Sequence, residues 1–253
     1  MFIDARGRRH LKTLRAGHRI TIRGTVIVND EIIGNFEGCT AGQGEAESFL
    51  VFRPSYAELS TIIERPAEPV FAKDAAVILI RAGIGGGARI IEAGVGGGTL
   101  TMALLAAVGH EGRVSSYEIR EDLAEAARHN VRKYYGETPH WTLRVRDASF
   151  GFEERDVDAV IADVPDPDTL VDAVAEALRP GGVFAVYVPT VLQIKQIHDA
   201  VEGRPEFACA ETVEIFERGW HVAGRSVRPE QRMIGHTGFL TFIRRTAVPF
   251  TRA

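Results

Sequence analysis

The chain has few cysteines, no long apolar run and no histidine cluster. Its 253 residues include two cysteines, Cys39 and Cys209, which lie far apart and form no CxxC pair. This usage favours a reduced cytoplasmic protein and argues against a disulfide framework or a structural zinc site. No apolar stretch approaches the roughly 20 residues of a membrane-spanning helix, and the N-terminus has no apolar signal segment. We therefore expect a cytoplasmic protein that uses neither a metal nor a membrane.

Acidic residues outnumber basic ones, but the basic residues are unevenly spread. The formal net charge is −4. The first 29 residues hold seven Lys and Arg residues, including Arg9 and Arg19, against the single acid Asp4, while the remainder holds 23 basic and 33 acidic residues. Such asymmetry indicates a surface that faces a polyanion, although a solvated basic arm on an acidic protein explains it equally well.

The first 64 residues are typical of a small β domain. Short β-branched runs alternate with glycines, and no long helical period is present. A short helix over 56–64 and a proline-rich linker over 65–69 end this region. We therefore expect an N-terminal β domain of residues 1–64 and a second domain of residues 65–253. The expected N-terminal strands are 19–28, 32–34 and 48–52.

From residue 73 onward, strand-like and helix-like segments alternate, which implies right-handed crossovers and a mostly parallel, doubly wound sheet. A long polar connection without a clear helix separates the last two strands, so we expect them to pair antiparallel. The expected strands are 89–94, 114–118, 141–146, 159–163, 183–188, 208–216 and 239–244. The expected helices are 74–83, 99–108, 121–135, 168–179 and 191–202. The pattern predicts an α/β, Rossmann-like seven-stranded sheet of the class I methyltransferase type.

A glycine-rich turn joins the first of these strands to a helix. Gly94, Gly96 and Gly98 stand at alternate positions within residues 92–101. A buried strand that ends in such a turn at a helix N-terminus brings backbone N–H groups close to a ligand. A dinucleotide fingerprint needs its third glycine where Thr101 stands. The turn therefore favours another nucleotide-like ligand, and a ligand-free tight turn is the alternative.

Carboxylates follow this turn at the ends of successive strands. Glu92 precedes the glycines, and Glu118, Asp147 and Asp163 end or follow the next three expected strands. Because the carboxyl ends of parallel strands meet at one edge of the sheet, these side chains are expected to gather there. Glu118 offers two acceptor oxygens for ribose hydroxyls, whereas Asp147 could instead cap a helix or turn. The set favours S-adenosylmethionine over a ligand with a pyrophosphate.

Further motifs carry a family resemblance over most of the chain. They are Asp30-Glu31-Ile32-Ile33-Gly34, Lys73-Asp74-Ala75-Ala76, Ser116-Tyr117-Glu118, Tyr187-Val188-Pro189-Thr190, Arg218-Gly219-Trp220-His221-Val222 and His236-Thr237-Gly238-Phe239-Leu240. On these residues the chain resembles the tRNA (adenine-N1)-methyltransferases that modify the T-loop adenosine at tRNA position 58. The C-terminal motifs are specific to that family, whereas the glycine-rich turn is shared by methyltransferases generally.

The resemblance implies S-adenosylmethionine-dependent methylation of N1 of adenosine 58 in tRNA, with adenosine 57 left open, by a homotetramer. It implies that Asp163 is the catalytic residue that orients the target adenine. The implied cofactor-binding residues are Glu92, Gly94, Gly96, Gly98, Thr99, Leu100, Glu118, Asp147 and Asp163. The residues expected to contact the substrate are Tyr187, His236, Arg9 and Arg19.

One departure from the family pattern bears on the substrate. The loop after Asp163 usually reads Pro-Glu-Pro-Trp, but here it is Pro165-Asp166-Pro167-Asp168, which has no aromatic residue. In the glycine-rich turn, Val95 and Gly97 replace the usual Thr and Ser. Two alternatives therefore stay open. The chain could be a non-catalytic tRNA-binding subunit of a methyltransferase complex, or a methyltransferase for another class of substrate.

Overall fold

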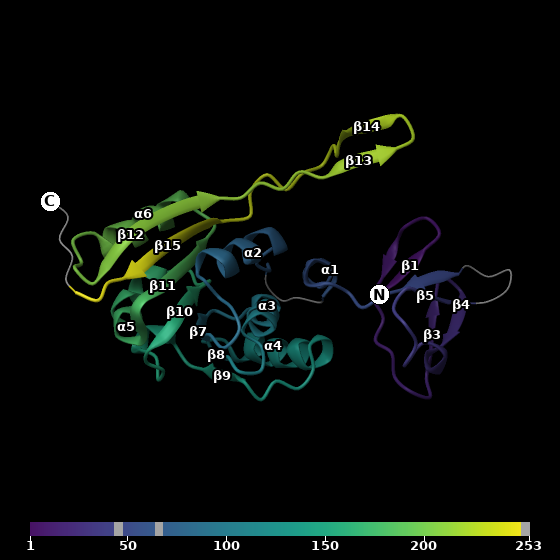
Figure 1. Cartoon of the computed structure of the whole chain (residues 1–253), viewed down its shortest axis with the longest axis horizontal. Helices are drawn as coiled ribbons and strands as arrows, with labels where there is room; N and C mark the ends of the chain where they lie inside the picture. The colour runs from purple at the N-terminus through teal and green to yellow at the C-terminus, as the bar shows by residue number, and fades with distance from the viewer. Residues whose placement is uncertain (43–47, 64–67, 249–253) are drawn as a thin grey trace. The chain divides into compact units, whose positions relative to one another are not determined.

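The computed structural model describes residues 1–42, 48–63 and 68–248, which are drawn in colour in Figure 1. The chain forms two compact units, Met1–Ile62 and Ile63–Ala253. The expected linker over 65–69 and the expected boundary at residue 64 fall largely outside the described residues.

The N-terminal unit is built on a four-stranded antiparallel sheet with the strand order β2-β1-β6-β5. These strands are β1 (Phe2–Asp4), β2 (Arg9–His10), β5 (Cys39–Ala41) and β6 (Phe49–Val51). A hairpin of β3 (Arg19–Ile22) and β4 (Thr25–Val28) and the helix α1 (Tyr56–Ile62) complete the unit. Phe2, Ile27 and Phe49 lie in its buried core.

Two of the expected N-terminal strands differ from the structure. Residues 19–28 form a hairpin instead of one strand, because Arg23 and Gly24 adopt positive φ angles of 50° and 86° and reverse the chain. The expected strand over 32–34 is wrong, since a 3₁₀ turn, η1 (Asn29–Glu31), leads into further turns there. Strands β1, β2 and β5 have two or three residues each, too few to show an alternating pattern in the sequence.

The second unit contains the expected seven-stranded sheet, with the order β12-β15-β11-β10-β7-β8-β9. Strands β11, β10, β7, β8 and β9 run parallel, while β15 pairs antiparallel with both β11 and β12. The predicted α/β architecture and its antiparallel final pair are confirmed. The strands are β7 (Arg89–Ala93), β8 (Arg113–Glu118), β9 (Trp141–Val145), β10 (Val157–Ala162), β11 (Leu178–Val188), β12 (Phe207–Glu214) and β15 (Phe239–Arg245).

Helices cover the sheet as the alternating pattern predicts (Figure 1). The first group, whose members pack on one another, is α2 (Ala72–Arg81), α3 (Thr99–Val108) and α4 (Glu121–Tyr134). The second group is α5 (Val171–Ala177), α6 (Val191–Val201) and the 3₁₀ turns η2 (Ala148–Phe150) and η3 (Pro167–Leu170). The helix expected over 168–179 is shorter than predicted, because its first turn is 3₁₀ and β11 already begins at Leu178. Within the described ranges, each helix is too short or too polar to span a bilayer.

The connection between β12 and β15 holds a β-hairpin that the sequence pattern does not predict. Its strands are β13 (Trp220–Ala223) and β14 (Ser226–Pro229), which pair only with each other among the strands of the described residues. Figure 1 shows this hairpin projecting away from the seven-stranded sheet.

One buried carboxylate organises the turn between β1 and β2. Asp4 Oδ1 accepts hydrogen bonds from the backbone N–H groups of Arg6 and Arg8 at 2.9 Å each. Its Oδ2 lies 2.7 Å from Arg8 Nε and 3.2 Å from His10 Nε2. Burial disfavours ionisation of Asp4, but these hydrogen bonds outweigh it and hold the pKa of the carboxyl far below its ordinary value.

Replacing Asp4 by Asn should therefore destabilise the N-terminal unit at pH 7. The bonds that lower the pKa contribute stability above the unfolded-state pKa, near 3.9, and this contribution is lost as the pH falls further. Calorimetry should show a lower Tm for Asp4→Asn at pH 7 and a smaller difference from the wild type at pH 3. Glu31→Gln, an exposed change in the same unit, is the control. An unchanged Tm for Asp4→Asn at pH 7 would contradict this account.

Candidate functional site

A pocket of about 780 Å³ opens at the carboxyl ends of the central parallel strands. It collects five of the residues predicted from the sequence, Gly94, Gly96, Glu118, Asp147 and Asp163. These residues come from the turns after β7, β9 and β10 and from the last residue of β8, so the shared edge of the sheet brings them together. The rest of the lining includes Tyr117, Ile119, Arg120, Leu123, Arg146, Pro165, Asp166, Pro189 and Gln193.

Gly94 is the point at which two strand ends approach most closely. Its φ is +82°, and a Cβ atom built on it would lie 2.1 Å from the backbone oxygen of Asp163. On the other side of the same contact, the Asp163 N–H donates a 2.9 Å hydrogen bond to the carbonyl of Ala93. Any side chain at position 94 would push the Asp163 loop away from β7. Gly94 thus places Asp163 beside the glycine-rich turn.

The Glu118 carboxylate is enclosed by that turn. It is 6% exposed, and its Oε2 accepts hydrogen bonds from the N–H groups of Val95 at 3.0 Å and Gly96 at 3.3 Å. Its Oε1 accepts a 3.0 Å bond from Arg120 N–H. Because a carboxylate offers about four acceptor positions, Oε1 retains capacity for a further donor in the pocket. Glu118 therefore both orders the turn and presents an acceptor to a ligand.

Glu92 lies beneath the pocket and does not line it. Its side chain is fully buried and accepts hydrogen bonds from the hydroxyls of Thr101, at 2.8 Å and 3.1 Å, and Ser116, at 2.6 Å. Burial raises the pKa of Glu92 to about 8 despite these bonds, and the nearby carboxylates of Asp163 and Glu118 add to the shift. Glu92 therefore links β7 to α3 through Thr101 and to β8 through Ser116, below the pocket.

The remaining predicted loop residues, Gly98, Thr99 and Leu100, are also buried below the lining. Gly98 caps α3 with a φ of 79°. A Cβ atom on Gly98 would lie 3.2 Å from the Ala127 Cα in α4. Gly98 therefore lets α3 and α4 pack closely at the N-terminus of α3, and the predicted cofactor contact of these three residues stays a prediction.

Asp163 is half-buried, and its carboxylate forms no hydrogen bond or ion pair within the described part of the chain. Burial raises the pKa of Asp163 to about 7, and the negative charge of Glu118 contributes to the shift. A pocket-lining carboxyl with this pKa and no partner is available to accept a hydrogen bond from a ligand. Such perturbed groups in a cleft are typical of functional sites.

Asp147 caps a turn and also lines the pocket. Its Oδ1 accepts a 2.8 Å hydrogen bond from Ser149 N–H and thereby caps η2, so the capping alternative is confirmed. Asp147 also lines the pocket, where Oδ2 is left for a ligand donor.

Tyr187 and His236 lie behind the pocket wall and do not line it. The Tyr187 hydroxyl donates a 2.7 Å hydrogen bond to the carbonyl of Thr237. The two ring nitrogens of His236 lie 2.7 Å from Glu214 Oε1 and 2.7 Å from the carbonyl of Pro189. Both partners are acceptors, and the hydrogen bond with Glu214 raises the pKa of His236 above its ordinary value. Pro189 lines the pocket, which gives His236 an indirect link to it.

Arg9 and Arg19 belong to the N-terminal unit and are exposed. Arg9 forms an ion pair with Glu58, with 3.3 Å between Nη1 and Oε1. Arg19 lies in β3. Their predicted contact with a substrate stays a prediction.

Sequence reasoning did not assign several lining residues to the site. Ile119, Arg120 and Arg146 directly follow or precede the predicted acids, so their places next to strand ends could have identified them. Gln193 in α6 donates a 2.8 Å hydrogen bond to the Pro165 carbonyl, which ties α6 to the Asp163 loop. This last contact is long-range, and no local pattern predicts it.

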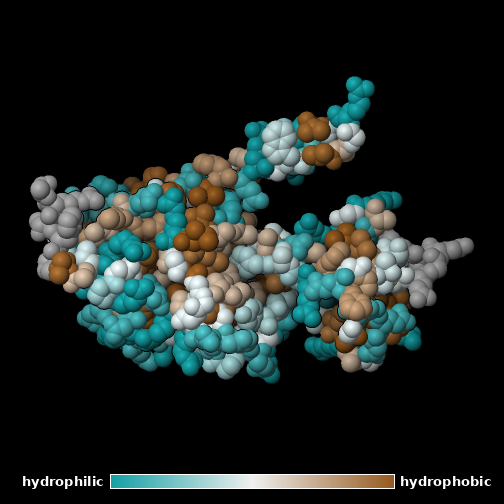
Figure 2. All heavy atoms as spheres, viewed as in Figure 1, coloured by the Kyte–Doolittle hydropathy of each residue, from teal (hydrophilic) through white to brown (hydrophobic). Residues whose placement is uncertain are grey.

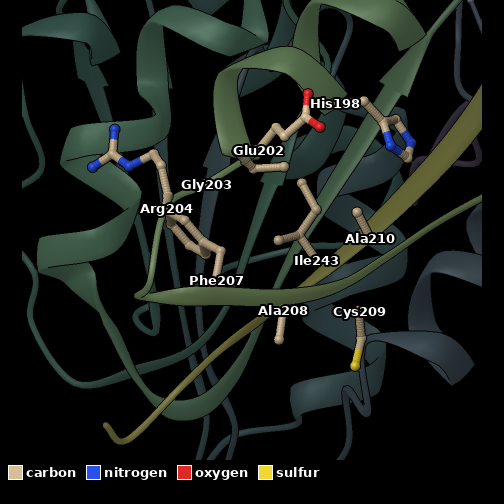
Figure 3. Close-up of a pocket in the computed structure, with 10 residues that line it drawn as sticks. His198, Glu202, Gly203, Arg204, Phe207, Ala208, Cys209, Ala210 and Ile243 are labelled. Atoms are coloured by element: carbon tan, nitrogen blue, oxygen red, sulfur yellow. The ribbon is translucent and has the colours of Figure 1, made fainter. Parts of the chain in front are cut away.

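A second pocket, of about 470 Å³, lies between the end of α6 and the first residues of β12, at the opposite edge of the sheet. Figure 3 shows His198, Glu202 and Ile243 around this space, while the side chains of Ala208 and Cys209 extend from the other side of β12. Its lining includes none of the predicted site residues. Across the described ranges, no group of three or more His, Cys, Asp or Glu side chains could hold a metal ion.

Comparisons with known proteins identify the family of the chain. A family model described as the tRNA methyltransferase complex GCD14 subunit matches residues 55–228. A Methanocaldococcus jannaschii protein named tRNA (adenine(57)-N(1)/adenine(58)-N(1))-methyltransferase TrmI is 30% identical, covering 100% of this chain and 96% of that protein. A Thermus thermophilus protein named tRNA (adenine(58)-N(1))-methyltransferase TrmI is 31% identical over 79% of this chain and 78% of that protein.

Solved structures show the same fold. A Thermotoga maritima protein described as a SAM-dependent O-methyltransferase superposes with a TM-score of 0.89 and 30% identity, covering 99% of this chain and 93% of its own. The Aquifex aeolicus tRNA methyltransferase TrmI superposes with a TM-score of 0.78 and 25% identity, covering 94% of this chain and 92% of its own.

The Gly94 contact can be tested by substitution. Gly94→Ala places a methyl group against the Asp163 backbone in a left-handed conformation, which costs roughly 1–2 kcal/mol before the clash is counted. We expect a lower Tm and loss of S-adenosylmethionine binding in calorimetric titration. Gly86→Ala, where a Cβ meets open space, is the control. Wild-type binding by Gly94→Ala would show that the close approach of β7 and β10 is not needed.

Proposed function

The chain belongs to the tRNA methyltransferase complex GCD14 subunit family, and from that premise we propose that it methylates N1 of adenosine 58 in the T-loop of tRNA. Supporting this proposal, the related proteins of Methanocaldococcus jannaschii and Thermus thermophilus are named for adenine-N1 methylation of tRNA. The first is named for positions 57 and 58 and the second for position 58 alone, so adenosine 57 is a further candidate position. The methyl donor is S-adenosylmethionine.

The observation that carries the proposal is the gathering of Glu118, Asp147 and Asp163 around one pocket. Three carboxylates in a partly buried space repel one another, and a ligand with a positive charge relieves that repulsion. S-adenosylmethionine has a sulfonium cation, two ribose hydroxyls and an adenine amino group. The lining acids can accept hydrogen bonds from the hydroxyls and the amino group, and their negative charge attracts the sulfonium cation, so the residues present fit this ligand.

We assign each cofactor contact to the oxygen of the Glu118 or Asp147 carboxylate that accepts fewer hydrogen bonds from the chain itself. Glu118 Oε1 receives a ribose hydroxyl, because Oε2 already accepts two backbone N–H groups. Asp147 Oδ2 receives the adenine amino group, because Oδ1 caps η2. Gly94 and Gly96 line the pocket with backbone. Glu92, Gly98, Thr99 and Leu100 support the same turn from below.

The chemistry needs positioning more than acid or base catalysis. Bound S-adenosylmethionine supplies an electrophilic methyl group, and adenine N1 already has a lone pair. The chain's main task is therefore to align N1 with the methyl group. As N1 gains positive charge, the ionised Asp163 accepts a hydrogen bond from the 6-amino group of the target adenine and stabilises that charge.

Binding of tRNA is the second part of the proposal. We propose that residues 1–64 form an RNA-binding domain, in which Arg9 and Arg19 contact phosphates, and that residues 65–253 form the methyltransferase domain. The T-loop adenine must leave its stack to reach the pocket, at a cost of a few kcal/mol. Tyr187 and His236 stabilise the part of the pocket wall at Pro189, which the incoming base contacts. A cytoplasmic location follows from a tRNA substrate.

A different acceptor is the strongest competing function. The Thermotoga maritima neighbour is described as an O-methyltransferase, and the loop Pro165-Asp166-Pro167-Asp168 has no aromatic residue to hold an adenine. Under this alternative, the same pocket binds S-adenosylmethionine while a small hydroxyl compound replaces tRNA.

We further propose that the chain assembles as a homotetramer through the β13–β14 hairpin. Trp220, Val222 and Val227 are 59%, 71% and 61% exposed. The strand register places Val222 opposite Val227 and Trp220 opposite Pro229, all on one face of the hairpin, and Figure 2 shows apolar side chains there. Because an isolated two-stranded hairpin is at best marginally stable in water, this apolar face needs a cover, and a second copy of the chain supplies it.

Nucleoside mass spectrometry separates the substrate alternatives. Incubation of unmodified tRNA with the protein and S-adenosylmethionine should yield 1-methyladenosine, and fragment analysis should place it at position 58, with or without position 57. Small hydroxyl compounds should remain unmethylated. Methylation of those compounds with none in tRNA would establish the competing function. Binding of tRNA without methylation would make the chain a non-catalytic subunit.

The role of Asp163 predicts a specific pH dependence. Its pKa of about 7 means that the carboxyl is protonated below pH 7 and cannot accept from the 6-amino group as an anion. For the wild type, kcat/KM should therefore rise as the pH increases through about 7. Asp163→Asn should lower kcat by roughly 100-fold or more and flatten the profile. Asp199→Asn, an exposed change on α6, should match the wild type.

Assembly can be tested by placing a charge on the apolar face. Val222→Glu should reduce the mass measured by light scattering from that of a tetramer, because burying the new carboxylate in an interface is unfavourable. Val248→Glu, at an equally exposed valine outside the hairpin, should leave the mass unchanged. A wild-type mass of one chain would refute the homotetramer.

A further inference from the structure

The β13–β14 hairpin has a second face with a different chemistry. Since side chains alternate along each strand, the register that puts Trp220 and Val222 on one face puts His221 and Arg228 on the other. His221 lies directly opposite Arg228, and Arg225 sits in the turn that joins the two strands. One face of the hairpin is therefore apolar, whereas the opposite face, the basic face, carries Arg228 and His221.

The arginines of this segment have no acidic partners. Arg218, Arg225, Arg228 and Arg232 are all exposed, and none of them forms an ion pair within the described residues. Within the described residues, the one hydrogen bond of their guanidinium groups joins Arg228 Nη1 to the carbonyl of its neighbour Pro229, at 3.3 Å. Four guanidinium groups are therefore free to bind an external anion.

Elsewhere in the same unit, many arginines, exposed or half-buried, pair with a carboxylate of the chain itself. Those with a carboxylate within ion-pair distance are Arg81, Arg120, Arg128, Arg132, Arg144, Arg146, Arg155, Arg179 and Arg204. The hairpin segment 217–232 holds four arginines against Glu217 and Glu230, although the whole chain carries a net charge of −4. Unpaired basic side chains on a projecting element of an acidic protein indicate a polyanionic partner.

We propose that the basic face of the hairpin binds the phosphate backbone of the tRNA substrate. Guanidinium groups pair with phosphates through two parallel hydrogen bonds, and such contacts give affinity without reading the base sequence. The inference rests on the proposed function, but it locates a tRNA contact outside the N-terminal unit. When another copy of the chain covers the apolar face, the basic face stays exposed to solvent. The hairpin therefore serves both assembly and tRNA binding.

The test compares tRNA binding by the full chain and by a double variant, Arg225→Gln with Arg228→Gln. Each phosphate contact contributes about one unit to the slope of log K against log salt concentration. We expect the slope to fall by about 2, and the KM for tRNA to rise at least tenfold while kcat is unchanged. Arg132→Gln, an arginine 79% exposed and paired with Glu137, is the matched control and should keep the wild-type slope.

Three results would overturn the inference. The first is an unchanged salt slope and KM in the double variant while the wild type methylates tRNA. The second is an equal effect of Arg132→Gln, which would show only a general loss of positive charge. The third is a reduced mass of the double variant in light scattering, which would make these arginines part of the assembly interface. If the wild type binds tRNA without methylating it and the slope still falls, the proposed catalytic function fails but the hairpin contact stands.

Discussion

The end of β7 lies so close to the end of β10 that residue 94 can carry no side chain. The hydrogen bond from Asp163 N–H to the Ala93 carbonyl joins these strand ends on one side, and the absent Cβ of Gly94 allows the contact on the other. Because β7 is also paired with β8, the same approach brings Glu118 to the glycine-rich turn. The position of Asp163 beside the glycine-rich turn, which Glu118 orders, therefore depends on this one contact between strands.

Bringing these acids together has an electrostatic consequence. Burial and neighbouring negative charge raise the pKa values of Glu92 and Asp163 to about 8 and 7. Glu92 is compensated by hydroxyl donors from Thr101 and Ser116, whereas Asp163 has no such compensation within the described residues. Other residues of the chain thus donate hydrogen bonds to Glu92, whereas the Asp163 carboxyl is left to accept a hydrogen bond from a ligand in the pocket. This division of roles suits a cationic ligand and a substrate with an amino group.

The sequence predicts most of the sheet, because its strands are apolar runs that alternate with helices and end in recognisable acids. It also predicts Gly94, Gly96, Glu118, Asp147 and Asp163, which all line the pocket at the edge of the sheet. It does not show that Glu92 is buried below the pocket, since strand position alone does not reveal partners such as Ser116. The three-residue strand β1 is missed because it pairs with β6, which lies far along the chain. The β13–β14 hairpin is missed because its two strands have only four residues each.

The central claim is that the sheet edge holds Asp163 as an uncompensated acid for a cationic ligand. The most direct test is the pKa of the Asp163 carboxyl, measured by carbon NMR with and without ligand. We predict a pKa near 7 in the free protein, a lower pKa with S-adenosylmethionine, and a smaller decrease with S-adenosylhomocysteine, which lacks the sulfonium charge. An ordinary pKa in the free protein, or equal shifts with both ligands, would contradict the account.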